Sequence, residues 1–255
     1  MAGLFNLSGK TVLATGATKG IGQSMTLALA EAGADVIILQ RDLSNTDTKT
    51  KVEALGRKCT LIQCDMSERE RISEAVKEAL SVSQVHVLLN SAGLQRRFPA
   101  EELSYEAWDD VQRTNLAAIF AMCREVGTRW LAEKRRGVII NVASLAAMQG
   151  GINMAAYAAS KGGVLQLTKA LSNEWSGRGI RVNCVSPGYI ATDINKDVRT
   201  KPEYKANYDS ITSRIPMGRW GDADDFKGVA VFMASDASAY MSGENLVIDG
   251  GWMAR

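Results

Sequence analysis

Residues 11–25 read TVLATGATKGIGQSM, and this stretch decides the fold. The run at 11–15 is apolar and β-branched, as is typical of a buried strand, and a helical pattern follows it. Gly16, Gly20 and Gly22 lie between the two. Glycines permit a tight turn and let a phosphate approach the backbone more closely than a Cβ allows. The stretch therefore predicts a strand, a phosphate-binding turn and a helix whose N-terminus faces an anion.

The alternation of strand and helix continues along the chain. Amphipathic stretches such as 22–33 and 74–82 lie between short apolar runs. Strands that are apolar on both faces predict a parallel sheet covered by helices on both sides. We predict an α/β fold in one domain, 1–255: a single-domain, Rossmann-like, doubly wound parallel sheet of about seven strands. The strands are expected at 11–15, 35–39, 59–63, 85–89, 137–142, 180–185 and 245–248.

Composition and charge exclude several classes of protein. The 30 basic and 28 acidic residues leave a net charge of +2, without the basic face that nucleic-acid binding needs. No run approaches the roughly 18 apolar residues of a membrane span, and the N-terminus lacks a signal-peptide pattern. The four cysteines show no metal-ligand spacing and are expected to be buried thiols in a reducing compartment. We expect a cytoplasmic protein with no metal, nucleic-acid or membrane partner.

Two further features concern single segments. The only histidine, His86, lies in a predicted buried strand, where a Ser-His-Asp triad is not expected. The least regular segment, 190–221, holds two of the four prolines and many charges. Long insertions after the end of a strand often form mobile lids. We predict a substrate lid here, the alternative being a surface loop without function.

The end of the second predicted strand bears on the choice of a dinucleotide cofactor. An acidic residue there would hold a ribose 2′-hydroxyl, whereas a basic one accommodates a 2′-phosphate. Gln40 occupies the expected place of the acid, Arg41 follows it, and Lys19 lies in the glycine turn. These residues favour NADP(H). NAD(H) stays possible, because Asp42 could bind a ribose or pair with Arg41.

A second chemical signal is SLAAMQGGINMAAYAASK, residues 144–161. Tyr157 and Lys161 are four residues apart, on one face of a helix expected to begin near Ala155. A nearby ammonium favours the phenolate, and the positive nicotinamide ring of an oxidised cofactor adds to this effect. We therefore expect the tyrosine pKa to move from about 10 toward 7, where the group serves as an acid or base. The pair alone could be an exposed helix pair. Ser144, at the end of a predicted strand, favours the catalytic interpretation.

These motifs together resemble those of the short-chain dehydrogenase/reductase family, from end to end of the chain. TGATKGIG (15–22) resembles the cofactor motif, NSAG (90–93) the family's NNAG with a serine in second place, and SPGYIAT (186–192) the segment that closes over the nicotinamide. The resemblance implies hydride transfer between a nicotinamide and a carbonyl carbon, with Tyr157 handling the proton. It also implies that Asn115 anchors a water in a proton relay.

The resemblance implies a cofactor site and an assembly as well. Family members are mostly tetramers joined through two long helices, here about 101–134 and 155–177, and through the last strand, so a homotetramer is expected. The cofactor-binding residues it implies are Gly16, Thr18, Lys19, Gly20, Ile21, Gly22, Gln40, Arg41, Asp65 (for adenine), Met66, Asn90, Ala92, Gly93, Tyr157, Lys161, Pro187, Gly188, Ile190 and Thr192.

More particular strings point to the substrate. GLQRRFP (93–99) and VIDGGWMAR (247–255) resemble the branch of the family that acts on gluconate-type and deoxygluconate-type sugar acids. Arginine suits a planar carboxylate, so Arg96 and Arg97 are candidate substrate ligands. The alternative is that both pair with the acidic residues at 101 and 102. Gln149, Trp220 and the C-terminal residues 252–255 are candidates for the pocket wall.

Three functions remain in view at this point. The first is a dehydrogenase or reductase of a keto-sugar acid. The second is a broad-specificity carbonyl reductase or 3-oxoacyl-thioester reductase, with methionines such as Met148 and Met217 lining an apolar pocket. The third is a non-catalytic cofactor-sensing protein, which is disfavoured because Asn115, Ser144, Tyr157 and Lys161 are all retained.

Overall fold

The computed structural model describes residues 2–254, which build one seven-stranded sheet in the order β3-β2-β1-β4-β5-β6-β7. Every neighbouring pair is parallel, which confirms the predicted fold class. The fourth strand begins two residues later than expected, so His86 precedes it. The strands are β1 (Thr11–Thr15), β2 (Asp35–Gln40), β3 (Cys59–Gln63), β4 (Val87–Asn90), β5 (Gly137–Val142), β6 (Ile180–Pro187) and β7 (Asn245–Ile248).

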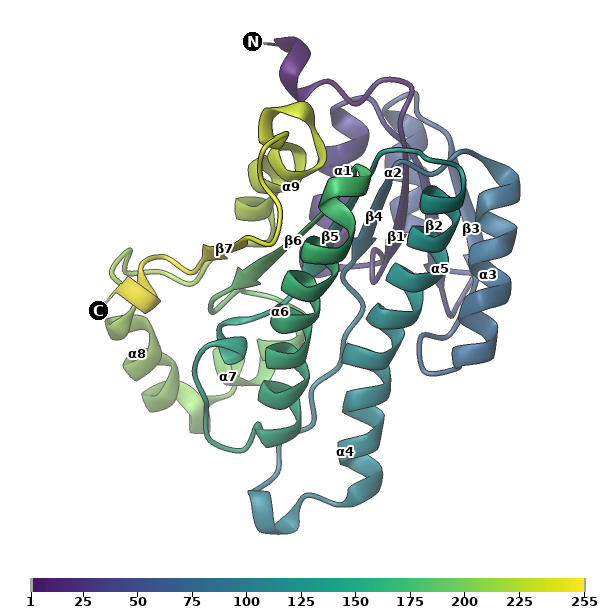
Figure 1. Cartoon of the computed structure of the whole chain (residues 1–255). Helices are drawn as coiled ribbons and strands as arrows, with labels where there is room; N and C mark the ends of the chain where they lie inside the picture. The colour runs from purple at the N-terminus through teal and green to yellow at the C-terminus, as the bar shows by residue number, and fades with distance from the viewer. Residues whose placement is uncertain (1, 255) are drawn as a thin grey trace.

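Helices cover both faces of the sheet. Figure 1 shows α3 (Arg69–Val82), α5 (Ala118–Ala132) and α6 (Ala155–Trp175) in front of it. Behind it lie α1 (Gly20–Glu31), α2 (Asp47–Ala54) and α9 (Lys227–Ala234). The remaining helices are α4 (Tyr105–Gln112), α7 (Lys196–Thr200) and α8 (Lys205–Arg214). Within residues 2–254, no helix combines the length and the apolar character needed to cross a membrane.

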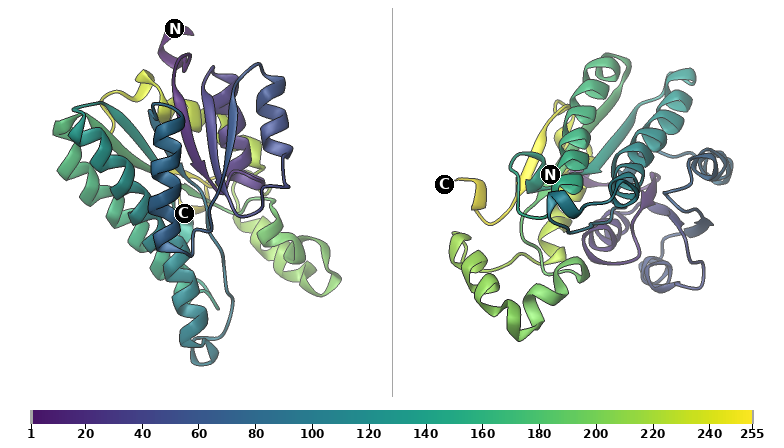
Figure 2. Two further views of the ribbon diagram at one scale, coloured as in Figure 1. Left: turned by 90° about the vertical axis from the view of Figure 1, so that its right-hand side faces the viewer. Right: turned by 90° about the horizontal axis from the view of Figure 1, so that it is seen from below.

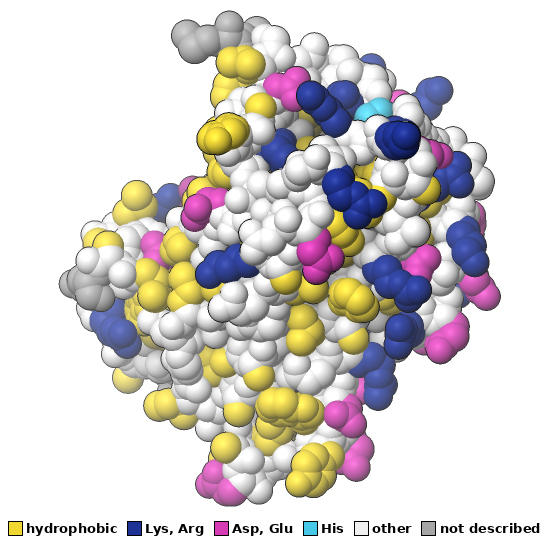
Figure 3. Space-filling view, viewed as in Figure 1, with side chains coloured by type: hydrophobic (Ala, Val, Ile, Leu, Met, Phe, Trp, Pro, Cys, Tyr) yellow, Lys and Arg dark blue, Asp and Glu magenta, His cyan; other side chains and the backbone are white. Residues whose placement is uncertain are grey.

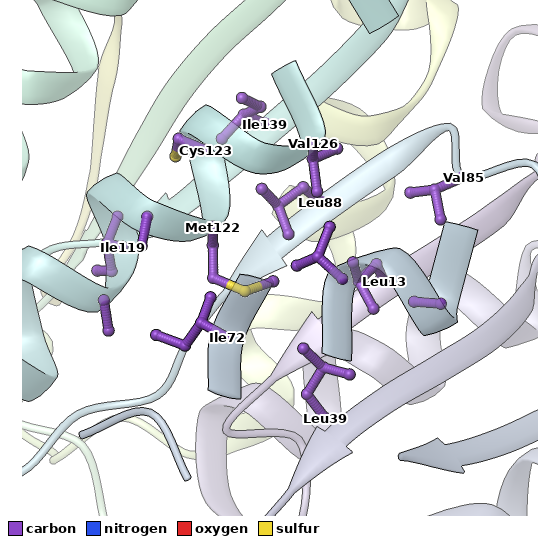
Figure 4. Packing of buried hydrophobic residues seen from close by; sticks show 14 of the residues in the cluster. Leu13, Leu39, Ile72, Val85, Leu88, Ile119, Met122, Cys123, Val126 and Ile139 are labelled. Carbon is purple, nitrogen blue, oxygen red and sulfur yellow. The ribbon is translucent and has the colours of Figure 1, made fainter. Parts of the chain in front are cut away.

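Alternate strand residues supply the two cores. On β1, Leu13 joins the cluster under α3, α5 and α6, whereas its neighbours Val12 and Ala14 join the cluster under α1, α2 and α9. Figure 4 shows the first cluster, in which Leu13, Leu88 and Ile139 of three strands meet helix residues such as Met122. Burying each such side chain stabilises the fold by roughly 1.5–3 kcal/mol. Apolar character on both sides of each strand thus accounts for the doubly wound arrangement.

The helix expected at 101–134 is not continuous. It consists of α4, a π-helical turn at Arg113–Ala117, and α5. In that turn the Ala118 N–H donates to the carbonyl of Arg113, five residues earlier. The prediction of one helix was therefore wrong, and the interruption contains Asn115. Single π-turns inside α-helices are frequent at functional sites.

The loops that follow the strands gather at one edge of the sheet. The order of strands reverses between β1 and β4, and ligands of open α/β sheets bind at such a switch point. Segment 190–221 follows β6 and carries α7 and α8, which project beyond the strands (Figures 1 and 2). A parallel bridge between Ile190 and Gly221 holds its two ends together.

Candidate active site

The glycine turn after β1 packs against the NSAG segment, 90–93. Gly16 and Gly20 have φ values of +65° and +57°, which favour glycine. A Cβ on Gly16 would lie 2.5 Å from backbone atoms of NSAG, and one on Gly22 would lie 2.2 Å from the Gly16 carbonyl oxygen. These two glycines are thus required by packing within the protein, a reason that differs from the phosphate approach inferred from sequence. At Gly20 the nearest neighbour of a Cβ would be the Thr192 side chain, at 3.4 Å.

The donor set at this turn fits the phosphates of a dinucleotide. Helix α1 starts after Lys19 without a side-chain cap, so the backbone N–H groups of Gly20 and Ile21 face outward from the helix end. The helix dipole adds a partial positive charge there. The exposed Lys19 ammonium forms an ion pair with Asp193 at 3.0 Å. Thr18 is half-buried beside it, and its carbonyl accepts a hydrogen bond from Gln23.

The end of β2 differs in detail from expectation. The Gln40 side chain turns back, and its Nε2 donates to the carbonyls of Asp42 (2.6 Å) and Asn45 (2.9 Å), so it shapes the loop. Asp42 accepts from the backbone N–H and hydroxyl of Ser44, and these bonds lower the pKa of its carboxyl. The expected pairing of Asp42 with Arg41 is not found among residues 2–254, and the expected contact of Asp42 with a ribose stays a prediction. Among residues 2–254 no hydrogen bond or ion pair engages the exposed Arg41 guanidinium, so this cation is free to bind an anion.

The neighbouring loop lies on the side of the site where the adenine is expected. The Asp65 carboxylate accepts from the Ser67 backbone N–H and hydroxyl, both at 2.8 Å, and so holds the turn after β3. Met66 is buried and lines a cavity of about 260 Å³ together with Ile72 and Arg113. An apolar wall beside a polar turn is suited to a flat base.

Ser144, Tyr157 and Lys161 come together at the carboxyl edge of the sheet. Ser144 follows β5, and its hydroxyl accepts from the Ala146 N–H at 3.1 Å, which fixes its rotamer at the start of a short 3-10 turn. Helix α6 begins at Ala155 as predicted and carries the other two residues. The Lys161 Nζ lies 5.7 Å from the centre of the Tyr157 ring, so the two share one helix face.

The electrostatics of this cluster run against one expectation. Burial raises the pKa of Tyr157 above its ordinary value, and the hydrogen bond with Ser144 and the positive charge of Arg97 oppose this only in part. Burial also lowers the pKa of Lys161 to about 8. The Lys161 Nζ donates to the carbonyl of Val142 at 2.7 Å. Among the protein's own groups desolvation therefore outweighs the neighbouring charges, and the acidification of Tyr157 beside a positive nicotinamide ring stays a prediction.

Asn115 is fully buried and joins three segments. Its Oδ1 accepts from the Leu94 N–H at 2.8 Å, and its Nδ2 donates to the Leu94 carbonyl at 2.9 Å and to the Ser160 hydroxyl at 3.2 Å. A Cβ on Gly93 would lie 3.4 Å from Asn115 Oδ1 and 3.6 Å from Lys161 Nζ. The residue thus lies beside the lysine, with its side chain used to hold the loop after NSAG.

Asn90 and its neighbours lie behind the site, in the core. The Asn90 Nδ2 donates to Asn141 Oδ1 at 2.9 Å, and the Asn141 Nδ2 donates to the Thr168 hydroxyl at 3.0 Å. All three side chains are fully buried. The side chain of Asn90 therefore links β4 to β5 and α6, and its place among the cofactor-binding residues stays a prediction. The backbone of Ala92 instead receives the turn at Gly16.

The segment after β6 returns across the glycine turn. Pro187 ends the strand, and a Cβ on Gly188 would lie 2.7 Å from Asp249, so the C-terminal segment packs closely there. Ile190 is buried in the core, and Thr192 reaches Gly20. The segment after β6, whose residues are expected to contact the nicotinamide, thus lies at the same edge of the sheet as Ser144.

The two arginines proposed for the substrate differ from each other. Arg96 lies 3.9 Å from Asp110, so the expected alternative of pairing with the acids at 101 and 102 was wrong. Arg97 is exposed, and its positive charge acts on Tyr157. No hydrogen bond or ion pair of the Arg97 side chain is found within the part of the chain that the structure describes. Gln149 is half-buried in the loop between Ser144 and α6.

An aromatic cluster that the sequence did not reveal fastens segment 190–221. Trp220 is buried, and its ring lies 5.2 Å from Tyr189 and 5.3 Å, stacked, from Tyr208. Tyr189 in turn contacts Trp252 at 4.7 Å, and all pack with Leu145, next to Ser144. Trp220 is thus internal to this cluster and not an open pocket wall. The sequence could not reveal the cluster, because its aromatic residues come from segments far apart along the chain. Arg255, another candidate for the pocket wall, lies outside the described residues.

Comparisons with known proteins agree with this geometry. The family model described as enoyl-(acyl carrier protein) reductase matches residues 16–253. The chain is 46% identical to the 2-dehydro-3-deoxy-D-gluconate 5-dehydrogenase of Pseudoalteromonas atlantica and 45% identical to that of Bacillus subtilis, covering 98% of this chain in both and 98% and 97% of the relatives. A gluconate 5-dehydrogenase from Burkholderia cenocepacia, solved in complex with NADP and tartrate, superposes with a TM-score of 0.93 at 32% identity, covering 100% of this chain and 99% of that one.

Three observations lead to one conclusion. The family model and the relatives match nearly the whole chain, the sheet is parallel, and the glycine turn lies at the same edge of the sheet as Ser144, Tyr157 and Lys161. The chain belongs to the short-chain dehydrogenase/reductase family and is a nicotinamide-dependent oxidoreductase.

Proposed function

We propose that this protein, acting as one catalytic domain, reduces or forms a keto-sugar acid of the gluconate or deoxygluconate type with NADP(H). The observation that carries the proposal is the position of Arg97, a cation without a protein partner among the described residues whose charge reaches Tyr157. A substrate with its carbonyl at the phenol can then place a carboxylate at the guanidinium. Relatives with 45–46% identity are dehydrogenases of such an acid, which supports the assignment.

The proposed mechanism gives each catalytic side chain one task. The bound nicotinamide supplies or accepts the hydride at the substrate carbon. The Ser144 hydroxyl holds the substrate oxygen, and Tyr157 passes a proton to it or takes one from it. Because its pKa is raised, Tyr157 is protonated at neutral pH and suited to donate in the direction of reduction. Lys161, with a pKa of about 8, brings the positive charge that stabilises the phenolate left behind.

Asn115 takes a positioning part in this mechanism. Its amide is occupied by Leu94 and Ser160, so a relay water there would bind its backbone carbonyl, in the π-turn. The same contacts hold the loop that carries Arg96 and Arg97 against α6. The loop, the acid–base residue and the lysine are therefore fixed relative to one another.

NADP(H) is the preferred cofactor in this proposal, and NAD(H) stays possible. The exposed Arg41 side chain and Lys19 of the glycine turn provide two cations, while the carboxylate of Asp42 is directed to Ser44. The relative from Burkholderia cenocepacia was solved with NADP, which supports this choice. We also propose that segment 190–221 forms a lid over the substrate, that the protein works in the cytoplasm, with free buried thiols as support, and that it assembles as a homotetramer.

Substitution of the two arginines tests the proposed substrate class. Arg97→Ala should raise KM for 5-keto-D-gluconate at least about tenfold, since a charged hydrogen-bonded contact is lost, and should change KM for a neutral ketohexose little. Arg96→Ala is the matched control, because that side chain is held near Asp110. Initial rates on both substrates give the answer. A similar rise in KM for the neutral ketose would contradict a carboxylate contact.

A second candidate is a carbonyl reductase of broad specificity or a 3-oxoacyl-thioester reductase. Met148 and Met217 are exposed beside the loops that frame Ser144, and such side chains accept varied apolar groups. The matching family model also carries an acyl-carrier reductase description. A higher kcat/KM for acyl thioesters than for keto-sugar acids, measured on one enzyme preparation, would favour this candidate.

A further inference from the structure

One ion pair joins the glycine turn to segment 190–221. Lys19, at the N-terminus of α1, lies 3.0 Å from Asp193, which is far away in the sequence. Both side chains are about two-thirds exposed, at 70% and 65%. The pair therefore lies on the rim of the site, where a ligand from solvent can reach it.

The surroundings of Asp193 show why its carboxylate lies at the turn. The bridge between Ile190 and Gly221 fixes the root of the segment, and Thr192 packs beside Gly20. The next residue then has the Lys19 ammonium within reach. Lys19, together with Lys196 and Arg199, holds the pKa of Asp193 below its usual range, so the carboxylate is charged at neutral pH.

A carboxylate and a phosphate can both bind the positive ammonium group of Lys19. The ammonium is a point charge that binds either anion without a fixed geometry. A phosphate of the proposed cofactor that approaches the turn therefore competes with Asp193 for this ammonium. Arg41, by contrast, has no competing anion within residues 2–254.

We propose that Asp193 competes with a cofactor phosphate for Lys19 and so sets the affinity of the glycine turn for the dinucleotide. Binding of the dinucleotide breaks the ion pair and releases the first turn of segment 190–221 from the glycine turn. Asp193 thereby weakens phosphate binding and links the segment to the state of the cofactor site. The inference rests on the proposed use of a phosphate-bearing dinucleotide and is independent of the substrate class.

Binding of two fragments without nicotinamide tests the competition. Asp193→Asn should tighten binding of 2′,5′-ADP, 5′-ADP or both by about two- to fivefold, the range expected for an exposed ion pair. The fragment that gains identifies which phosphate meets Lys19. Asp197→Asn is the matched control, since it removes an equal charge from the same segment but pairs with Lys201. Isothermal titration calorimetry measures both fragments with the wild type and with each variant, and melting temperatures confirm that both variants are folded.

A double-mutant cycle separates competition from a general charge effect. In the Lys19→Met background, Asp193→Asn should change fragment affinity no more than Asp197→Asn does. The proposal is overturned if Asp193→Asn and Asp197→Asn tighten both fragments equally, or if the gain persists without Lys19. A failure of the sugar-acid assignment would leave these binding results unchanged, because neither fragment contains a substrate.

Discussion

At the level of single residues, Tyr157 is subject to opposing influences. Burial keeps its proton on, whereas Ser144 and Arg97 favour the phenolate. The sequence predicted the pair with Lys161 and the serine nearby, because helix periodicity and strand ends are local. It did not predict that the lysine amine would reach the Val142 carbonyl or that desolvation would decide the pKa. Those outcomes depend on how tightly α6 packs on β5.

Replacement of the phenol tests its role in proton transfer. Tyr157→Phe should lower kcat by about 10²–10⁴-fold, the usual contribution of a general acid or base. Cofactor affinity should change little, since ring packing is kept. Steady-state rates and a titration of cofactor fluorescence measure the two quantities. Tyr105→Phe, on an exposed tyrosine of α4, is the control, and full activity of the Tyr157→Phe enzyme would exclude this mechanism.

At the level of elements, features set by the local sequence pattern could be predicted, whereas features set by long-range contacts could not. All seven strands and the start of α6 could be predicted from apolar runs and glycines. The interruption of the long helix by a π-turn could not, since Asn115 bonds to the distant Leu94 backbone. Two other side chains also could not be placed from the local sequence. The Gln40 amide donates to carbonyls of its own loop, and Trp220 packs with aromatic residues of other segments.

The buried chain of hydrogen bonds from Asn90 through Asn141 to Thr168 places α6 against β4 and β5. Thr168→Val should lower the free energy of unfolding by about 1–3 kcal/mol, because the Asn141 Nδ2 loses its acceptor in the core. Thr168→Ser should retain most of the stability. Denaturant unfolding of the three proteins measures this. Equal midpoints for the valine variant and the wild type would show that the bond contributes nothing to stability.

At the level of the whole molecule, the surface differs between its two ends. Figure 3 shows the histidine among basic side chains in the upper part, and apolar side chains gathered in the lower half. The exposed large apolar side chains include Tyr105, Ile152 and Met217. Such a surface is consistent with association between subunits, and the homotetramer stays a prediction until the mass in solution is measured.

Global stability should depend on pH through the single histidine. His86 Nδ1 accepts from the Thr11 N–H at 3.1 Å, and burial, Lys10 and Arg135 lower its pKa. The folded state therefore binds its proton less readily than the unfolded state, whose histidine has a pKa near 6.5. The resulting contribution is present above that pH and is lost as the pH falls below it.

Urea unfolding at pH 7.5 and pH 5.5 measures this dependence. The wild type should lose more stability between the two values than His86→Asn, whose amide oxygen can accept the same hydrogen bond without titrating. The carboxylates are common to both proteins, so their titration cancels in the comparison. An identical loss in the two proteins would mean that His86 makes no pH-dependent contribution.

The bridge between Ile190 and Gly221 has a consequence for how such a protein can change during evolution. Because Ile190 and Gly221 pair with each other, the segment between them can be lengthened, shortened or exchanged while the strands keep their register. A longer insertion between these two residues costs little additional loop-closure entropy, since that entropy grows only with the logarithm of loop length. Activity on new substrates can thus be acquired by replacing segment 190–221 while the sheet and its helices stay unchanged.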